Sequence, residues 1–262
     1  MNLPRLGFDD AGDGEPALLM LTGWCSSRGR WDRARPLLER GRRVVSFEWR
    51  GHGESAAAEA DFGIAEMVDD ALAVMQARGL GTVIPCAASH SGWVAIELQR
   101  RLGPERVPAI VHLDWTVTEP PPPYMALLAQ LQSPTDWPSA RDALFAIWRG
   151  GSDSPEIAQA IEVMRRQDAE MWIRSGRVIE GSYRTHSCPL LALSQLPAPP
   201  RVLHLYGQPR GDEYLSAQRA FAAAHPWFEV DRLSGATHFS MIETPAEVAD
   251  AIEAFAAAVP VR

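Results

Sequence analysis

Ser89, His238 and an aspartate are the residues of this sequence whose types fit a shared proton-transfer site. Ser89 lies in the stretch AASHS at residues 87–91, which matches the G-x-S-x-G pattern of a nucleophile elbow with small residues replacing both glycines. In such a set a histidine takes a proton, an acid orients the histidine, and a serine attacks or orients the substrate. An alternative reading of Ser89, as an ordinary serine that caps a helix, stays open.

The acid has two candidates. Asp114 directly follows an apolar run at 109–113, whereas Asp212 comes after a loose, glycine-containing loop. Arg210 lies in that loop and is close enough in sequence to neutralise the Asp212 carboxylate. We favour Asp114, because a residue at the end of a strand is held in a defined position, and Asp212 remains the alternative.

The elements that must position these residues are strands and helices in alternation. Short apolar runs predict strands, and stretches with apolar residues at i, i+3 and i+4 predict helices. This alternation predicts an α/β fold with a mostly parallel, doubly wound sheet. Strands are predicted at residues 17–21, 43–47, 82–87, 109–113, 201–206 and 228–233, and helices at 31–39, 65–78, 93–102, 214–224 and 245–258.

The place of each chemical residue in this order narrows the fold class. Ser89 lies between a strand and a helix, Asp114 ends the next strand, and His238 lies between the last strand and the last helix. This is the chain order of the α/β-hydrolase fold, which we therefore predict. In that fold two backbone N–H groups form an oxyanion hole, and Trp24 and His90 would supply them.

The alternation of strands and helices breaks between residues 117 and 188. This segment opens on a run of prolines and then shows helical periodicity without a convincing strand. We predict that it forms a helical cap, inserted after the strand that ends at Asp114. Residues 1–116 and 189–262 would then form the α/β-hydrolase core of one integrated domain.

Three tryptophans, Trp137, Trp148 and Trp172, lie in the predicted cap. Indoles are bulky, flat and weakly polar, so they suit the walls of a pocket for a flat aromatic ligand. A tryptophan also packs readily in an ordinary core. We expect one of the three to serve packing alone and the others to roof an apolar pocket.

Composition excludes several classes of partner. The net charge of -8 disfavours nucleic acid and anionic membranes, and no apolar run is long enough to span a bilayer. We therefore expect a cytoplasmic protein, a monomer or a small homo-oligomer, with no nucleic acid and no membrane partner. Cys25, Cys86 and Cys188 fit free thiols in a reducing compartment. No motif has the ligand spacing of a metal site, so we expect no metal.

Residues 51–56 formally match a dinucleotide fingerprint, Gly51-x-Gly53-x-x-Ala56. Such a site needs a helix that begins at the glycines and points its N-terminus at the pyrophosphate. The next predicted helix begins only near Ala65. We therefore interpret the stretch as a structural loop and expect no nucleotide there.

Several stretches together resemble the cofactor-free 2,4-dioxygenases of 3-hydroxy-4-quinolones and 3-hydroxyquinaldines, a branch of the α/β-hydrolase fold. The resemblance covers almost the whole chain and is far more specific than a generic triad. It rests on GWC at 23–25, WRGHGES at 49–55, SHSGW at 89–93, GPER at 103–106, LDW at 113–115, RSGRVIE at 174–180, HPWF at 225–228 and THF at 237–239.

The resemblance implies an enzyme that needs no cofactor and uses O2 as co-substrate to open the ring of a small aromatic N-heterocycle. His238 would take the 3-hydroxyl proton of the substrate, and Asp114 would hold the resulting imidazolium. Ser89 would orient the substrate rather than form an ester. The products would be carbon monoxide and an N-acylanthranilate.

The resemblance also implies how the substrate is held. The indoles of Trp148 and Trp172 would flank the ring, and the Trp24 N–H would hydrogen-bond it. Two positions depart from the family: Ser26 stands where certain relatives have a histidine, and Ser91 stands where a glycine is common. We therefore expect the mouth of the pocket, including the surroundings of Ser26, to differ.

The main rival is a serine hydrolase, such as an esterase or thioesterase, with Ser89 as the covalent nucleophile. It would use the same histidine and either aspartate. A non-catalytic binding member of the fold is a third possibility, against which the intact Ser/Asp/His set argues. The fold alone does not separate these functions.

Overall fold

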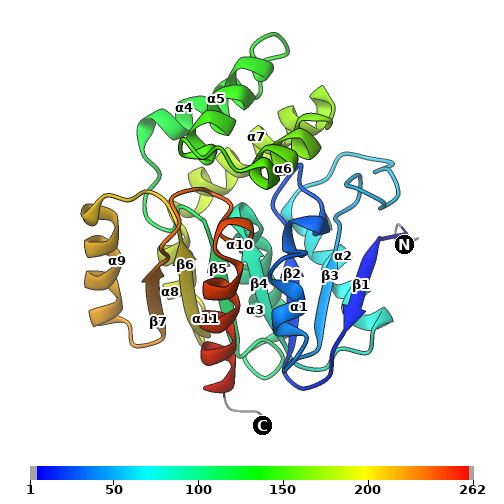
Figure 1. Ribbon diagram of the computed structural model, residues 1–262, viewed down its shortest axis with the longest axis vertical. Helices are drawn as coiled ribbons and strands as arrows, with labels where there is room; N and C mark the ends of the chain where they lie inside the picture. Colours follow the sequence, from blue (N-terminus) through cyan, green and yellow to red (C-terminus); the bar gives the residue numbers. More distant parts are fainter. Residues whose placement is uncertain (1–4, 260–262) are drawn as a thin grey trace.

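The computed structural model describes residues 5–259 and is built on one seven-stranded sheet (Figure 1). The strand order is β1-β3-β2-β4-β5-β6-β7, and every neighbouring pair is parallel except β1 with β3. The strands are β1 (Phe8–Ala11), β2 (Ala17–Leu21), β3 (Val44–Phe47), β4 (Val83–Ala88), β5 (Ala109–Leu113), β6 (Arg201–Tyr206) and β7 (Phe228–Arg232). This confirms the predicted mostly parallel sheet.

Helices cover both faces of the sheet, which explains why β2, β4 and β5 are buried along their whole length and read as continuous apolar runs. Helices α1 and α11 pack together on one face, α2, α3 and α8 lie on the other, and α9 packs on β7 (Figure 1). These elements are η1 (Arg28–Trp31), α1 (Arg35–Leu38), α2 (Ile64–Ala77), η2 (Ser89–Ser91), α3 (Gly92–Leu102), α8 (Pro189–Ser194), α9 (Asp212–Ala224), α10 (Ser240–Glu243) and α11 (Pro245–Ala257).

The chain between β5 and α8 forms four helices that stand above the carboxyl edge of the sheet (Figure 1). This is the predicted helical cap: α4 (Pro122–Gln130), α5 (Trp137–Arg149), α6 (Pro155–Arg165) and α7 (Ala169–His186). The longest, α7, packs closely on α4 at Gly176, where an added Cβ would lie only 2.8 Å from the Leu128 carbonyl oxygen. The roof of the site is therefore a packed unit rather than a loose loop.

The six predicted strands are all present, with ends shifted by one residue at most. The prediction missed β1, whose sequence FDDA carries two acids and forms an antiparallel edge. The single helix predicted at 31–39 was wrong, because the chain there forms η1 and then the short α1. Pro36 explains the break, since it lacks an N–H and favours the first turn of a helix.

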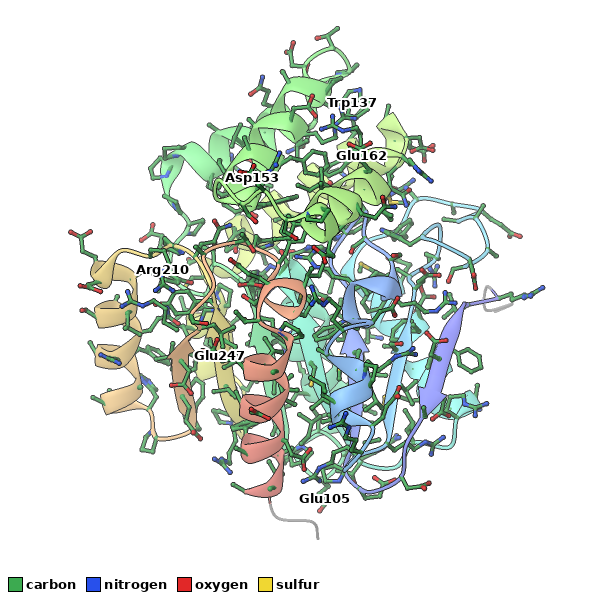
Figure 2. The ribbon with its side chains drawn as sticks, in the orientation of Figure 1. Glu105, Trp137, Asp153, Glu162, Arg210 and Glu247 are labelled. Atoms are coloured by element: carbon green, nitrogen blue, oxygen red, sulfur yellow. The ribbon has the colours of Figure 1, made fainter. Side chains whose placement is uncertain are left out.

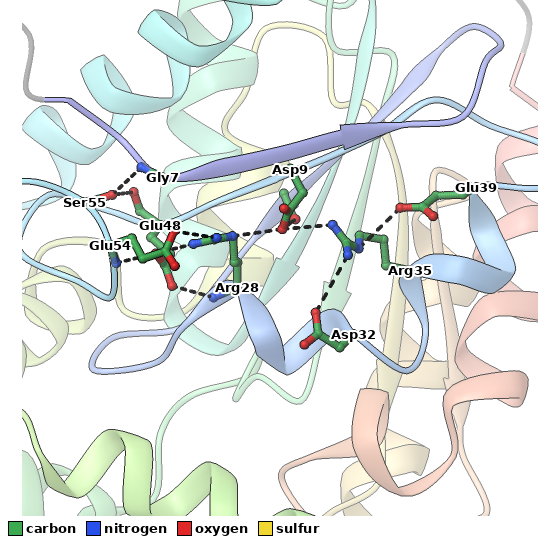
Figure 3. A network of polar contacts seen from close by, with 10 residues as sticks. Gly7, Asp9, Arg28, Asp32, Arg35, Glu39, Glu48, Glu54 and Ser55 are labelled. Atoms are coloured by element: carbon green, nitrogen blue, oxygen red, sulfur yellow. Dashed lines mark hydrogen bonds and ion pairs between the residues drawn. The ribbon is translucent and has the colours of Figure 1, made fainter.

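A network of ion pairs fixes η1 to the loop that follows β3 (Figure 3). Arg28 in η1 pairs with Asp9 at 2.9 Å, Glu48 at 2.7 Å and Glu54 at 2.8 Å. Gly53 has a φ of +51°, and an added Cβ would collide with the Glu48 carboxylate. The glycines at 51 and 53 thus build a compact structural loop, and α2 begins only at Ile64, as we expected.

Three further expectations concern single residues and segments. Cys25 and Cys86 are buried, Cys188 is half-buried, and all three are free thiols. Within residues 5–259, no helix combines the length and the apolar character needed to cross a bilayer. The same residues contain no cluster of three or more His, Cys, Asp or Glu side chains able to hold a metal ion.

Candidate active site

Ser89 lies at a sharp turn between β4 and α3. Its φ is +56°, a left-handed conformation that costs energy for any residue with a side chain and is typical of a nucleophile elbow. Ser89 is not the N-cap of either following helix, since Ala88 precedes η2 and Ser91 precedes α3. The reading of Ser89 as a capping serine is therefore wrong.

Ser91 explains how the elbow tolerates the loss of its second glycine. The Ser91 side chain is fully buried, and its hydroxyl lies 2.8 Å from the Ala88 carbonyl oxygen and 3.1 Å from the Leu21 carbonyl oxygen. It donates its proton to these acceptors and so joins the ends of β2 and β4. The next residue, Gly92, is the one that allows close packing, because an added Cβ would lie 2.2 Å from the Trp115 ring.

The loop after β2 faces the elbow. An added Cβ on Gly23 would lie 3.6 Å from the Ser89 Cβ, which places the Trp24 backbone beside the serine. No hydrogen bond of the described residues uses the Trp24 N–H, and the His90 N–H lies in a first helical turn, where helical partners are lacking. The two predicted oxyanion donors are thus available to a ligand. The Trp24 ring also stacks on His90, with centroids 5.5 Å apart.

His238 lies in the loop between β7 and α10 and is half-buried. Its ring stacks on the Trp148 indole, with centroids 5.1 Å apart and an interplanar angle of 17°, and its main-chain N–H donates to the Trp148 carbonyl at 2.8 Å. Desolvation, and secondly the Arg30 cation, hold the pKa of His238 well below 6.5. At neutral pH the imidazole is therefore uncharged and able to accept a proton.

Asp114 follows β5 and is 2% exposed. Its carboxylate accepts hydrogen bonds from the Gly207 N–H at 3.0 Å, the Ser240 N–H at 2.9 Å and the Ser240 hydroxyl at 2.8 Å. Burial raises the pKa of Asp114, and these hydrogen bonds together with the Arg30 charge oppose that rise. Among the described residues no hydrogen bond joins Asp114 directly to the His238 imidazole, and the link runs through Ser240, two residues further along the chain.

Asp212, the alternative acid, lies away from this site. It is the first residue of α9, its side chain is 87% exposed, and it pairs with Arg232 at 2.9 Å. Arg210, which we considered as its partner, instead donates to the carbonyls of Leu233 and Gly235. The position of Asp212 therefore favours Asp114 as the acid.

A pocket lies between the sheet edge and the cap. Its floor comes from the loops of the core and its roof from the cap. Trp148 and Trp172 line it, whereas Trp137 lies at the outer end of the cap (Figure 2), with Arg141 5.0 Å above its ring. The lining residues are Gly23, Trp24, Arg30, Ser89, His90, Tyr124, Leu128, Leu131, Leu144, Trp148, Met164, Trp172, Ser175, Ile179 and His238.

The pocket thus brings together the predicted residues Ser89, His238, Trp24 and His90. Ser26 is not part of the lining. It is buried, with 5% of its surface exposed, and its main-chain N–H donates to the Gly23 carbonyl at 3.4 Å. It therefore supports the loop after β2 from behind.

Sequence reasoning missed three polar residues of this site. Ser175 lies three residues after Trp172 on α7, so helical spacing alone places it on the same face. Ser240 has no comparable signal. Arg30 has none either, because nothing in its local sequence separates it from the ion-paired Arg28.

Comparisons with known proteins show the family of this chain. The family model described as "Alpha/beta hydrolase family" matches residues 18–251. A 2-heptyl-3-hydroxy-4-quinolone dioxygenase of Rhodococcus erythropolis is 36% identical, over 95% of this chain and 94% of the relative. The 1H-3-hydroxy-4-oxoquinoline 2,4-dioxygenase of Pseudomonas putida is 34% identical, over 97% of both chains.

Solved structures point the same way. An enzyme that cleaves the ring of the Pseudomonas quinolone signal, in complex with its product, has a TM-score of 0.94 at 35% identity, covering 98% of both chains. A thermophilic esterase from Thermogutta terrifontis, 21% identical with a TM-score of 0.76, covers 98% of this chain and 94% of its own and shows the same fold. The predicted α/β-hydrolase fold is confirmed, and the chain belongs to the α/β-hydrolase family and, within it, to the 3-hydroxy-4-quinolone 2,4-dioxygenases.

Proposed function

We propose that this protein is a cofactor-independent dioxygenase that cleaves the ring of a 3-hydroxy-4(1H)-quinolone with O2. The products are carbon monoxide and an N-acylanthranilate. The observation that carries the proposal is the position of the His238 imidazole, which stacks on the Trp148 indole inside an apolar pocket that also holds Trp172. The similarity to the named quinolone dioxygenases supports it.

His238 starts the reaction by taking the proton of the substrate 3-hydroxyl group. Ground-state O2 is a triplet and reacts slowly with closed-shell molecules, but the resulting electron-rich anion passes one electron to it directly. Superoxide and the substrate radical then combine at C2. The peroxide attacks C4, and the bridged intermediate breaks so that C3 leaves as carbon monoxide, one oxygen atom remaining at C2 and one at C4.

The other residues bind and shield the reacting atoms. The buried Asp114 carboxylate offsets the charge of the His238 imidazolium, and the N–H groups of Trp24 and His90 stabilise the oxyanion that forms at C4. Ser89 orients the substrate through its hydroxyl. The leucine-rich roof excludes water, which would otherwise protonate the substrate anion and the superoxide.

The experiment measures O2 uptake and carbon monoxide release by metal-free protein given 2-heptyl-3-hydroxy-4(1H)-quinolone. We expect His238→Ala to lose most of the activity and Ser89→Ala to retain much of it. His225→Ala is the matched control, because His225 lies at the end of α9, outside the pocket lining, and its imidazole hydrogen-bonds the Phe221 carbonyl.

A serine hydrolase makes the opposite prediction. Such an enzyme would hydrolyse simple aryl esters without O2 and would lose that activity in the Ser89→Ala variant. Ester hydrolysis of this kind, without carbon monoxide from the quinolone, would reject the dioxygenase and support the hydrolase. The elbow at Ser89 and its two free N–H groups are what make this rival worth testing.

A further inference from the structure

Arg30 is a buried cation in the wall of the candidate active site. It belongs to η1, is only 5% exposed, and lines the same pocket as Ser89 and His238. Within residues 5–259 no carboxylate lies within ion-pair distance of its guanidinium, whereas Arg28, two residues earlier, pairs with three. A buried charge without a partner is costly, so its persistence calls for a reason.

The described contacts of Arg30 use only part of its guanidinium. Nη2 donates to the main-chain carbonyl of His238, Nε lies 3.3 Å from the Met241 sulfur, and the group lies 4.5 Å above the Phe239 ring. None of the described hydrogen bonds uses Nη1. An added Cβ on Gly23 would lie 3.8 Å from Nη1, so this nitrogen faces the oxyanion side of the pocket.

The position of Arg30 is imposed by its neighbours. Arg28 anchors the start of η1 through the network in Figure 3, and the fully buried Trp31 anchors its end. The guanidinium between them cannot turn to solvent without breaking these contacts. The fold thus holds Nη1 at the pocket, with a donor geometry that is ready before any ligand arrives.

The charge of Arg30 is not balanced by an ion pair with any of the described side chains. Burial lowers the pKa of Arg30 to about 10, so the group is still protonated at pH 7. The ionisable side chains whose fields reach it are Asp114, His238 and His90. Both histidines are held uncharged by burial, and the Asp114 carboxylate already accepts three hydrogen bonds from Gly207 and Ser240.

We propose that Arg30 binds the deprotonated substrate, with Nη1 donating to the oxygens of its anionic 3-hydroxy-4-oxo edge. This inference rests on the proposed function. A charge-assisted hydrogen bond of this kind is stronger to the anion than to the neutral quinolone, so it favours the substrate anion and offsets the cost that the same cation imposes on a protonated His238. The same cation then faces the oxyanion that develops at C4.

The test is anaerobic binding of 3-hydroxy-4(1H)-quinolone across a range of pH, because the absorbance spectrum distinguishes the anion from the neutral form. At a given pH we expect Arg30→Met to lower the ratio of bound anion to bound neutral ligand about tenfold or more. Arg30→Lys keeps the charge and should restore most of that ratio. Arg33→Met is the matched control, since Arg33 is a neighbouring arginine with a 51% exposed side chain.

A second ligand distinguishes the loss of the Arg30 charge from damage to the pocket in the Arg30→Met variant. A 3-methoxy-4-quinolone cannot ionise at that oxygen, so folded Arg30→Met should bind it as tightly as the wild type does. Bound anion in Arg30→Met at the wild-type level would overturn the inference, as would loss of the anion in Arg30→Lys with the methoxy ligand still bound. If the wild type itself never deprotonates the quinolone, the proposed function fails instead.

Discussion

Asp114 holds Ser240 through two hydrogen bonds, one from the Ser240 N–H at 2.9 Å and one from its hydroxyl at 2.8 Å. Ser240 begins α10, two residues after His238. The buried carboxylate therefore fixes the backbone that carries the imidazole, in addition to any charge that it offers to the imidazolium. Asp114 therefore acts on His238 partly by positioning the main chain of the loop, through Ser240.

Ser240→Ala should weaken this link without removing a charge. The lost hydrogen bond to a buried carboxylate is worth about 2 kcal/mol, so we expect the free energy of unfolding to fall by that amount and kcat/KM about tenfold. Ser234→Ala is the control, because Ser234 is exposed and its hydroxyl bonds the Glu247 carboxylate. Urea unfolding and O2 uptake measure both effects, and equal losses in the two variants would refute the special role of Ser240.

The pH profile of kcat/KM should reflect the low pKa of His238. Only the uncharged imidazole accepts a proton, and burial together with Arg30 keeps its pKa well below 6.5. As the pH falls, activity should therefore persist below 6.5 and disappear only when the imidazole becomes protonated. Steady-state rates between pH 4 and pH 8, corrected for ionisation of the free substrate, would measure this. An acid limb at 6.5 or above would contradict it.

Trp148→Ala should impair catalysis more than Trp148→Phe. The indole stacks on His238, and its loss frees the ring and opens the pocket, whereas phenylalanine keeps an aromatic face. Since such pairs are worth about 1 kcal/mol, we expect kcat/KM to fall roughly fivefold in the alanine variant. Trp137→Ala is the control on the same helix, outside the pocket. A loss as large in Trp137→Ala would show that the cap as a whole, rather than the stack, matters.

Gly92→Ala should destabilise the elbow. The added Cβ would lie 2.2 Å from the Trp115 ring, which is fully packed, so we expect a loss of about 1–3 kcal/mol and a lower Tm. Gly181→Ala on α7 meets nothing within 4 Å and should be neutral or stabilising by up to about 1 kcal/mol. Calorimetry of both variants tests the contrast, which equal melting temperatures would disprove.

Acid should unfold the protein well before its carboxylates are all protonated. Burial lowers the pKa values of His52 and His204 to about 4, so the unfolded chain binds more protons below pH 6.5 than the folded chain does. Stability therefore falls as the pH drops from 6.5 towards 4, by about 2 kcal/mol per histidine at pH 5. The raised pKa values of Asp114 and Asp32 act in the opposite direction, but carboxyl groups titrate mainly below this pH range. Urea titrations at pH 7 and pH 5 with equal midpoints would contradict this.

The sheet can be predicted from the sequence because a strand that is buried on both faces is a short run of apolar residues. Strands such as β2 and β5 are runs of apolar residues with no polar face, and any residue at the carboxyl end of such a strand must lie at one edge. This is why Ser89 and Asp114 could be placed together in advance. The edge strand β1 carries no continuous apolar run, since its residues are exposed or half-buried and Asp9 pairs with Arg28.

Other parts of the site depend on contacts that no local pattern records. Arg30 is buried partly by Met241, which lies 211 positions away in sequence. Trp137 and Trp148 lie on nearly the same face of α5, eleven positions apart, so periodicity treats them alike. Their separation of about 16 Å along the helix axis decides which one reaches the pocket. Which of the two indoles enters the pocket is therefore determined by how the cap packs on the core.

The division of the pocket into a floor from the core and a roof from the cap has an evolutionary consequence. The residues that we propose to handle the proton belong to strand ends and their loops, whereas the apolar side chains that line the rest of the pocket belong mainly to α4, α5, α6 and α7. Duplicated copies of such a gene can therefore exchange cap residues and acquire different ring substituents while inheriting the same chemistry. Diversification among relatives should concentrate in residues 122–186.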